Sequence, residues 1–513
     1  MSFGGVAQAA YVNPVYQETG FVAQSHEQFE QAKTSWESAE YLDDWGLKAM
    51  NASSAYALGY NGAGIAVGVM DSGALLYKHP DLDGDRFHAV KVPGQSYGSS
   101  GNRYPQHKVD DGLYTPDSEV PVSGEWQQGM NDSHGTHVTG TVGGNRDGVV
   151  FHGVAWGADV HVGNTGGTDD TNYGPFQDPQ FFYQGWNAIA KDISDANKFS
   201  DGTTRGGFIN NSFGTNIRID LGGDKVGHFP TDTVSQTEYE YFLFMKDAEN
   251  RVNTDARWNG KSFVDAAYEA VKDEKVVQIF TTGNRDFANP FYRPLYPYFN
   301  PEAEQNWIAV SGLTKDGDNN YQLWNTVNEA GNAKWWTVVA PGTNISSSIV
   351  NNDGTPGYSN TYSGTSMAAP HVAGAMAVLM QRYDQMDALQ VRDVMLTTAT
   401  HYNPDGSVMT GWTNTDGTTP LDGQVSDRMG WGLPDLEKGM YGPGQFLGKF
   451  TYNMRDKDSL DVWSNDISQV ALDQRKDEDM AWKAAAEKGS VRNSVSAKVF
   501  QGAAHSGCSS FSG

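Results

Sequence analysis

The chain has 513 residues and a net charge of −26 at pH 7, because 62 acidic residues outnumber 36 lysines and arginines. This balance argues against binding to nucleic acid or to anionic lipid, since both need clustered cations. Hydrophobic residues make up 38% of the chain, enough for a packed core. No apolar run reaches the roughly 18 residues that predict a membrane-spanning helix.

The two ends of the chain differ in composition and patterning from its middle. The start, MSFGGVAQAA, ends in the small-residue pattern Ala7-Gln8-Ala9, which resembles the tail of a signal peptide but lacks its basic and apolar parts. The single cysteine, Cys508, excludes an internal disulfide. That fits either a reducing compartment or a surface protein that crosses a membrane unfolded. We expect an N-terminal extension over residues 1–40, with a signal-peptide remnant in 1–10.

The next segment, residues 36–60, carries apolar side chains at roughly helical spacing and predicts a helix. Short runs rich in Val, Ile and aromatic residues follow and predict strands. They lie at 64–70, 158–164, 207–213, 276–283, 307–313 and 335–342. Residues 261–275 place their apolar side chains on one helical face. Strands that alternate with helices predict an α/β fold, in which helices cover both faces of a mostly parallel sheet.

We expect one large domain over residues 41–440, with surface insertions at 85–125 and 215–260. In parallel sheets the ligand cleft lies at the carboxyl ends of the strands. Residues 441–513 are charged or small and weakly patterned, which predicts a spacer or the start of a stem.

Three motifs carry the chemistry. Asp71 ends a buried strand in VGVMDSG, His134 starts a small-residue helix in NDSHGTHVTGT, and Ser366 opens an apolar helix in YSGTSMAAPHVAG. A serine hydroxyl needs a base within reach, and that base needs an orienting carboxylate. Taken singly, each residue is more often a turn, a structural or a capping residue. All three in Gly-rich motifs predict a nucleophilic triad.

These motifs resemble the signatures of the subtilisin family of serine proteases over residues 50–440. The resemblance implies that Asp71 orients, His134 is the general base and acid, and Ser366 is the nucleophile, while His137 is structural. TTGN (281–284) resembles the segment whose asparagine, here Asn284, completes the oxyanion hole. The resemblance also implies substrate-binding residues in two segments, which are Ser212, Phe213 and Gly214 along a strand edge and Gly283 beside Asn284.

The resemblance implies no cofactor for the chemistry, but it raises a structural calcium ion. Asp81, in HPDLDGD, and Asp147, in the loop after the HGTH helix, supply the oxygen ligands that calcium prefers. An ordinary solvated loop explains these residues equally well. No His or Cys spacing predicts zinc.

The edges of the domain resemble a narrower branch, the passenger domains of Gram-negative autotransporter serine proteases. Residues 35–73 and 430–446 carry this likeness. It implies a secreted or cell-surface monomer, exported across the outer membrane with a C-terminal translocator barrel, that cleaves proteins or peptides and binds no nucleic acid.

Two other readings of the sequence remain open. One is a catalytically silent adhesin or binding module on a protease scaffold. The other is an acid-active serine carboxyl peptidase, which would use a glutamate base and lack the HGTH segment. An ordinary histidine base predicts that activity falls below about pH 6–7.

Overall fold

The computed structural model describes most of the chain between Pro14 and Gly442. The described residues are 14–17, 19–23, 26–97, 113–114, 122–166, 178–213, 219–220, 226–227, 256–258, 260–420 and 424–442. Gly214, much of both insertions and residues 443–513 lie outside these ranges.

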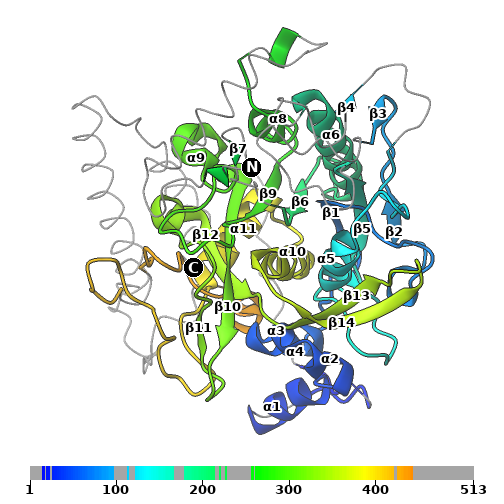
Figure 1. The fold of residues 1–513 in the computed structure, drawn as a ribbon. Helices are drawn as coiled ribbons and strands as arrows, with labels where there is room; N and C mark the ends of the chain where they lie inside the picture. Colours follow the sequence, from blue (N-terminus) through cyan, green and yellow to red (C-terminus); the bar gives the residue numbers. More distant parts are fainter. Residues whose placement is uncertain are drawn as a thin grey trace, which may run out of the picture.

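A mostly parallel eight-stranded sheet forms the centre of the molecule (Figure 1). Its order is β11-β10-β9-β6-β1-β5-β2, and β12 pairs with β10. Only β11 pairs antiparallel with its neighbour in this sheet. The strands are β1 (Ala66–Asp71), β2 (Phe87–Ala89), β5 (Asp159–Asn164), β6 (Gly207–Asn211), β9 (Val276–Thr281), β10 (Trp307–Lys315), β11 (Tyr321–Leu323) and β12 (Thr337–Pro341).

All six predicted strands are confirmed, as is the α/β class. Every residue of β1, β6 and β9 is buried, as expected for strands that are covered on both faces. The last predicted strand is shorter than expected, because Gly331–Trp336 forms a 3-10 helix before β12 begins at Thr337.

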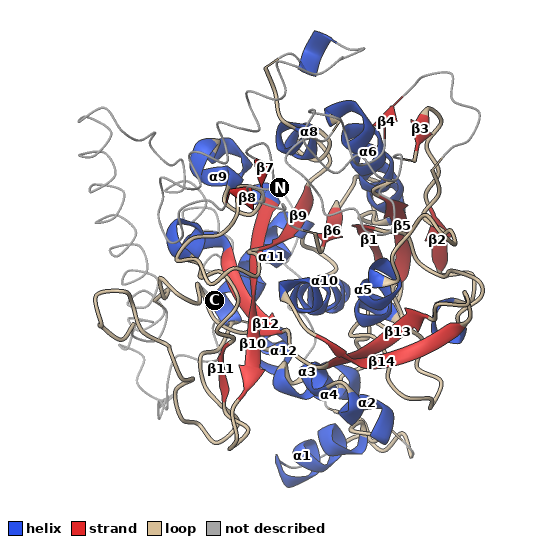
Figure 2. Cartoon of the chain, viewed as in Figure 1, coloured by secondary structure: helices blue, strands red, loops and turns tan. Residues whose placement is uncertain are grey.

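Helices cover both faces of the sheet, as Figure 2 shows. Val67 and Val69 of β1 pack into one core cluster, which includes residues of α5 and α10, whereas Ala66 and Met70 pack into the other, with α6 and α8. The helices are α1 (His26–Ser35), α2 (Ala39–Asp43), α3 (Trp45–Ala49), α4 (Ala52–Ala57), α5 (His134–Gly143), α6 (Pro179–Ala196), α8 (Phe263–Glu269), α9 (Tyr296–Phe299), α10 (Thr365–Arg382), α11 (Ala388–Thr398) and α12 (Leu436–Tyr441). Further 3-10 turns are η1 (Pro80–Leu82), η2 (Ala256–Trp258) and η3 (Pro301–Asn306).

The single helix predicted over residues 36–60 is wrong, because the segment forms three short helices. Asp44 has extended backbone angles, and its carboxylate caps α3 by accepting from the Gly46 amide at 2.9 Å. Asn51, at the N-terminus of α4, adopts a left-handed conformation with φ of 54° and separates α4 from α3. Helical spacing alone did not reveal these two breaks.

Short antiparallel hairpins complete the structure. The most extensive pairs β13 (Ile345–Val350) with β14 (Pro356–Tyr362), packs against α5 and leads directly into α10. Two smaller ones pair β3 (Gln95–Ser96) with β4 (Leu113–Tyr114) and β7 (Ile219–Asp220) with β8 (Val226–Gly227). Among the described residues, no helix combines the length and the apolar character that crossing a membrane requires.

Candidate active site

The predicted site residues follow three neighbouring parallel strands. Asp71 is the last residue of β1, Ser212 follows β6 directly, and Asn284 lies three residues after β9. Strand β6 pairs in parallel with both β1 and β9. The carboxyl ends of all three strands therefore meet at one edge of the sheet.

The Asp71 carboxylate contacts the His134 ring across the gap between β1 and α5. Asp71 Oδ1 lies 2.8 Å from His134 Nδ1 and also accepts from the Ser72 amide at 2.8 Å. The carboxylate is fully buried, whereas the His134 side chain is 29% exposed. The hydrogen bond at Nδ1 leaves Nε2 as the ring nitrogen that can take up a proton.

Two residues beside this pair bring α5 against the end of β1. Ser72 Oγ accepts from the Gly135 amide at 2.9 Å and donates to the Asp132 carbonyl at 3.0 Å. Gly135 itself has no room for a side chain, since a Cβ there would lie 2.2 Å from the Gly73 carbonyl oxygen. Both residues stand inside the quoted motifs, but sequence reasoning gave them no role.

Ser366 is the second residue of α10, and its side chain is half-buried. Its hydroxyl donates to the Ser212 carbonyl at 2.8 Å. Within the described residues this bond, rather than one to His134, engages the hydroxyl. A transfer of its proton to His134 therefore requires the hydroxyl to turn away from Ser212. Such adjustments are usual between free enzymes and their substrate complexes.

Asn284 is exposed and held in a defined orientation beside Ser366. Its Oδ1 accepts from the Thr365 amide at 2.9 Å and from the Thr365 hydroxyl at 3.1 Å. Its Nδ2 lies on the side of Gly364, 3.3 Å from where a Cβ would stand on that residue. The amide hydrogens thus remain available near the Ser366 backbone, where an oxyanion would form.

The loop that carries Asn284 depends on Asn328, which is fully buried. Asn328 Oδ1 accepts from the Arg285 amide at 3.0 Å, and its Nδ2 donates to the Thr282 carbonyl at 2.9 Å. Gly283 has φ of +113°, and a Cβ there would lie 2.5 Å from the Phe291 ring. No sequence signal near Asn328 pointed to this role.

The strand edge after β6 presents its backbone rather than its side chains. Phe213 is 3% exposed, and its ring packs against Phe182 and Phe280 at centroid distances of 6.1 and 6.3 Å. Ser212 is also buried, and its hydroxyl accepts from Asn210 Nδ2 at 2.9 Å. Any substrate contact in this segment would use main-chain groups. Gly214 lies outside the described residues.

The two histidines of the HGTH motif have opposite proton affinities. Burial lowers the pKa of His134, but the charge of Asp71, its hydrogen bond and the charge of Asp132 outweigh this and raise the pKa from 6.5 to about 9. His137 is fully buried, stacks on Tyr362 and bonds through Nε2 to the Ile345 carbonyl at 3.0 Å. Burial lowers the pKa of His137 to about 3, so this ring is neutral.

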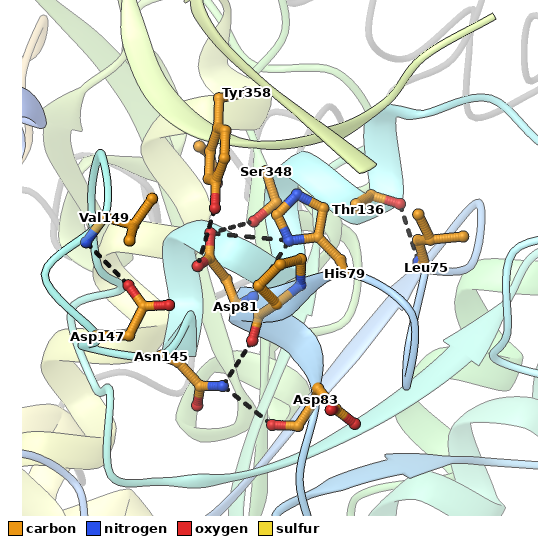
Figure 3. Close-up of polar contacts among 12 residues, drawn as sticks. Leu75, His79, Asp81, Asp83, Thr136, Asn145, Asp147, Val149, Ser348 and Tyr358 are labelled. Carbon is orange, nitrogen blue, oxygen red and sulfur yellow. Dashed lines mark hydrogen bonds and ion pairs between the residues drawn. The ribbon is translucent and has the colours of Figure 1, made fainter. Parts of the chain in front are cut away.

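The carboxylates predicted to share calcium face different partners. Figure 3 shows Asp81 turned toward Ser348 and Tyr358, whose hydroxyls lie 3.0 and 3.4 Å from its two oxygens. Asp147 instead accepts from the Val149 amide at 2.9 Å. Asp81 is fully buried, and burial raises its pKa to about 7. In the part of the chain that the structure describes, no three His, Cys, Asp or Glu side chains gather as a metal site.

The guanidinium group of Arg86 binds oxygen atoms of the loop after α5. Arg86 Nη1 donates to the Ala158 carbonyl at 2.9 Å, and Arg86 Nη2 donates to Asn145 Oδ1 at 2.6 Å and to the Gly143 carbonyl at 2.5 Å. Asn145 Nδ2 in turn donates to the carbonyls of Pro80 and Asp83. These oxygens are therefore already bound by side chains of the protein.

Comparisons with known proteins agree on one family. The model of the subtilase family, a peptidase family, matches residues 62–432. An extracellular serine protease of Serratia marcescens is 30% identical over 446 residues, which are 82% of this chain and 35% of that protein. Serotype-specific antigen 1 of Mannheimia haemolytica is 26% identical over 82% of this chain and 43% of its own length. The autotransporter lipoprotein NalP of Neisseria meningitidis serogroup B is 24% identical, over 82% of this chain and 37% of its own length. The chain thus spans less than half the length of each of these relatives.

The His134 ring should titrate well above 6.5, because the protonated ring is stabilised by the buried Asp71 carboxylate. The folded protein then binds this proton more tightly than the unfolded chain does. The contribution of His134 to stability should be complete below about pH 6.5 and lost as the pH rises through about 9. NMR titration of the ring protons measures this pKa directly. In Asp71→Asn the pKa should fall by more than one unit, and an unchanged value would contradict the proposed cause.

Proposed function

The chain belongs to the subtilase family, and from this premise we propose that it is a serine endopeptidase in which Asp71, His134 and Ser366 form the triad. The observation that carries the proposal is the 2.8 Å contact between the buried Asp71 carboxylate and His134 Nδ1, on the strand edge that also carries Ser212 and Asn284. This contact orients the ring so that Nε2 is the atom that accepts the serine proton.

In the proposed reaction the substrate backbone lies along Ser212, Phe213 and Gly214 and beside Gly283. Ser366 Oγ turns from the Ser212 carbonyl, loses its proton to His134 Nε2 and attacks the scissile carbonyl carbon. The oxyanion accepts hydrogen bonds from Asn284 Nδ2 and from the Ser366 amide at the start of α10. His134 then donates its proton to the leaving amine, and water hydrolyses the acyl-enzyme by the reverse sequence.

The electrostatics change the expected pH range of this reaction. The base acts only when its ring is neutral, and its pKa is raised to about 9 in the free protein. We therefore propose an acid limb of kcat/KM on the alkaline side of 6.5, rather than at the pH 6–7 expected for an ordinary histidine. The acid-active alternative with a glutamate base has no observation in its favour, whereas the Asp71 carboxylate contacts His134 Nδ1 at 2.8 Å.

We extend the proposal to a secreted or cell-surface protease of Gram-negative type, active as a monomer, with residues 41–440 as the peptidase unit. The support is the extracellular protease of Serratia and the autotransporter NalP among the relatives. Residues beyond 441 would lead to a translocator barrel, and the substrates would be proteins or peptides. The silent-adhesin alternative has no observation in its favour, since every group that the reaction needs is present.

Ser366→Ala should abolish turnover while the fold is kept, because the change removes only the nucleophilic oxygen. The parent should form one covalent adduct with a fluorophosphonate probe, and the variant should form none, as intact mass spectrometry shows. By the precedent of other serine proteases, loss of the nucleophile lowers kcat by roughly 10⁶. A folded parent that forms no adduct would refute the proposal.

Gly135→Ala should lower kcat/KM by about 100-fold, because the added methyl group pushes α5 away from β1 and displaces His134. Gly317→Ala is the matched control, since a Cβ at Gly317 meets nothing within 4 Å. Steady-state kinetics on a peptide substrate measure both variants. Activity of Gly135→Ala within twofold of the parent would show that the close approach of α5 is unimportant.

The chemistry of the family needs no cofactor, and we propose that Asp81 and Asp147 do not share a calcium ion. Asp81 accepts hydrogen bonds from two hydroxyl groups, Asp147 accepts one from a backbone amide, and Arg86 binds Asn145. A calcium site needs six to eight converging oxygens. Chelation should therefore leave the Tm of the Ser366→Ala variant, used to prevent self-digestion, unchanged within about 2 °C. A fall of about 5 °C that calcium but not magnesium reverses would restore the calcium prediction.

A further inference from the structure

Two buried titratable residues that the proposed reaction does not use contact each other between the N-terminal segment and α10. Asp44 precedes α3 and is 1% exposed, whereas His371 lies within α10 and is fully buried. Asp44 Oδ2 lies 2.9 Å from His371 Nε2. The contact joins residues 327 positions apart, and one of them is five residues from Ser366 in the same helix.

Hydrogen-bond geometry defines where the protons of this pair lie. His371 Nδ1 is 2.8 Å from the Met367 carbonyl, which can only accept, so Nδ1 carries a hydrogen. His371 Nε2 faces the Asp44 carboxylate, whose other oxygen accepts from the Gly46 amide at 2.9 Å. Both ring nitrogens thus face acceptors. Two arrangements satisfy these contacts, which are a ring with both protons beside an ionised carboxylate and a neutral ring beside a protonated carboxyl group. Imidazole is a stronger base than a carboxylate in water, and this favours the first arrangement.

The groups around the pair include one other cation, Lys315, which interacts with Asp44. Lys315, His137, His152 and Tyr56 are titratable residues that interact electrostatically with the pair. Burial lowers the pKa of His137 to about 3 and that of His152 to about 4, so both rings are neutral. Burial also lowers the pKa of Lys315, which stacks over Trp45 at 4.9 Å. Among the described residues, the His371 ring is thus in direct contact with the Asp44 carboxylate at 2.9 Å, whereas no ion pair within 4.0 Å joins Lys315 to it.

The approach of the two elements is set by a glycine. A Cβ on Gly46 would lie 2.2 Å from His371 Nε2 and 2.7 Å from its Cδ2. Gly46 lies inside α3, where alanine would otherwise favour the helix by about 1 kcal/mol. The glycine is thus explained by the ring that packs on it and not by the backbone of its own helix.

The same N-terminal residues contact the serine segment at a second point. Trp45 Nε1 donates to the Thr343 carbonyl at 2.8 Å, and the neighbouring Gly342 carbonyl accepts from the Gly364 amide at 2.7 Å. Within α10, Pro370 has no amide hydrogen to close the turn onto the Ser366 carbonyl. The bond from the His371 ring to Met367 adds a contact across this weakened turn.

From these contacts we infer that Asp44 and His371 form a buried carboxylate–imidazolium pair that positions the start of α10, and thereby Ser366, relative to His134. Neither residue touches substrate, so both are positioning residues. The inference rests on the proposed function for its catalytic consequence, but the state of the pair itself does not depend on it.

The protonation of the pair is tested by NMR on the protein with ¹⁵N-labelled histidine, in a Ser366→Ala background. His371 should show two ring N–H protons at pH 8, and Asp44→Asn should leave only one, because the amide can donate to a neutral ring nitrogen. His371→Gln assigns the signals. A single ring N–H in the parent at pH 8 would overturn the ionic pair whether or not the chain is a protease.

The positioning role is tested by the rate of fluorophosphonate labelling and by kcat and KM. Asp44→Leu and Gly46→Ala should each lower the labelling rate and kcat by about tenfold or more, with KM within about twofold. Asp44→Asn should retain most of the rate, because its amide replaces the hydrogen bond. The controls are Asp43→Leu and Gly317→Ala. The Asp43 carboxylate contacts Ser346 on β13 and not α10, and Gly317 has room for a Cβ.

Each outcome decides between the two claims. Equal labelling rates in the parent, Asp44→Leu and Gly46→Ala would overturn the positioning role. If Asp44→Leu fails to fold, Gly46→Ala still tests it, because that variant keeps both charges and changes only their distance. If the parent is not labelled at all, the proposed function fails, and the ring N–H count still reports on the pair.

Discussion

The chemistry proposed for this protein depends on one hydrogen bond, which joins the Asp71 carboxylate at the end of β1 to His134 at the start of α5. A carboxylate that is buried at the end of a strand has little freedom to move, so contact with His134 requires α5 to pack closely against β1. Gly135 and Ser72 make that approach possible, the first by having no side chain and the second by bonding to the backbone on both sides of His134. The position of His134 is thus set by main-chain packing more than by the flexibility of its own side chain.

The opposite face of α5 is fixed by the hairpin of β13 and β14. Ser347 Oγ donates to the His137 carbonyl at 2.7 Å, and the Tyr362 hydroxyl lies 2.8 Å from Ser133 Oγ. Because β14 leads into α10, the same hairpin connects the helix of His134, the proposed base, with the helix of Ser366, the proposed nucleophile. This arrangement also separates the roles of two histidines three residues apart. His134 faces a carboxylate and gains proton affinity, whereas His137 faces a ring and a carbonyl and loses it.

The sequence predicted the parts of this structure that repeat a simple physical pattern. Buried strands read as apolar runs, so all six were found, and the motifs around Asp71, His134 and Ser366 identified the family. It did not reveal contacts between residues distant in the chain. Asn328 supports the Asn284 loop through hydrogen bonds 43 and 46 residues away in sequence, and nothing near it is unusual. The three short helices replaced one because capping at Asp44 and the left-handed Asn51 outweighed the apolar spacing.

The pair of Asp44 and His371 illustrates why a buried charge pair is more informative about position than about stability. Replacing such a pair by apolar side chains of similar size is often neutral or stabilising, because burying two charges costs much of what their attraction returns. An apolar contact, however, would tolerate sliding of α3 along α10, whereas a bond of 2.9 Å between a ring nitrogen and a carboxylate oxygen does not. The hydrogen bond limits how far α3 can move away from α10, and the contact of Gly46 with the same ring limits how closely it can approach. For a helix that carries the proposed nucleophile, a fixed position matters more than additional stability. A displacement of about 1 Å is enough to impair catalysis.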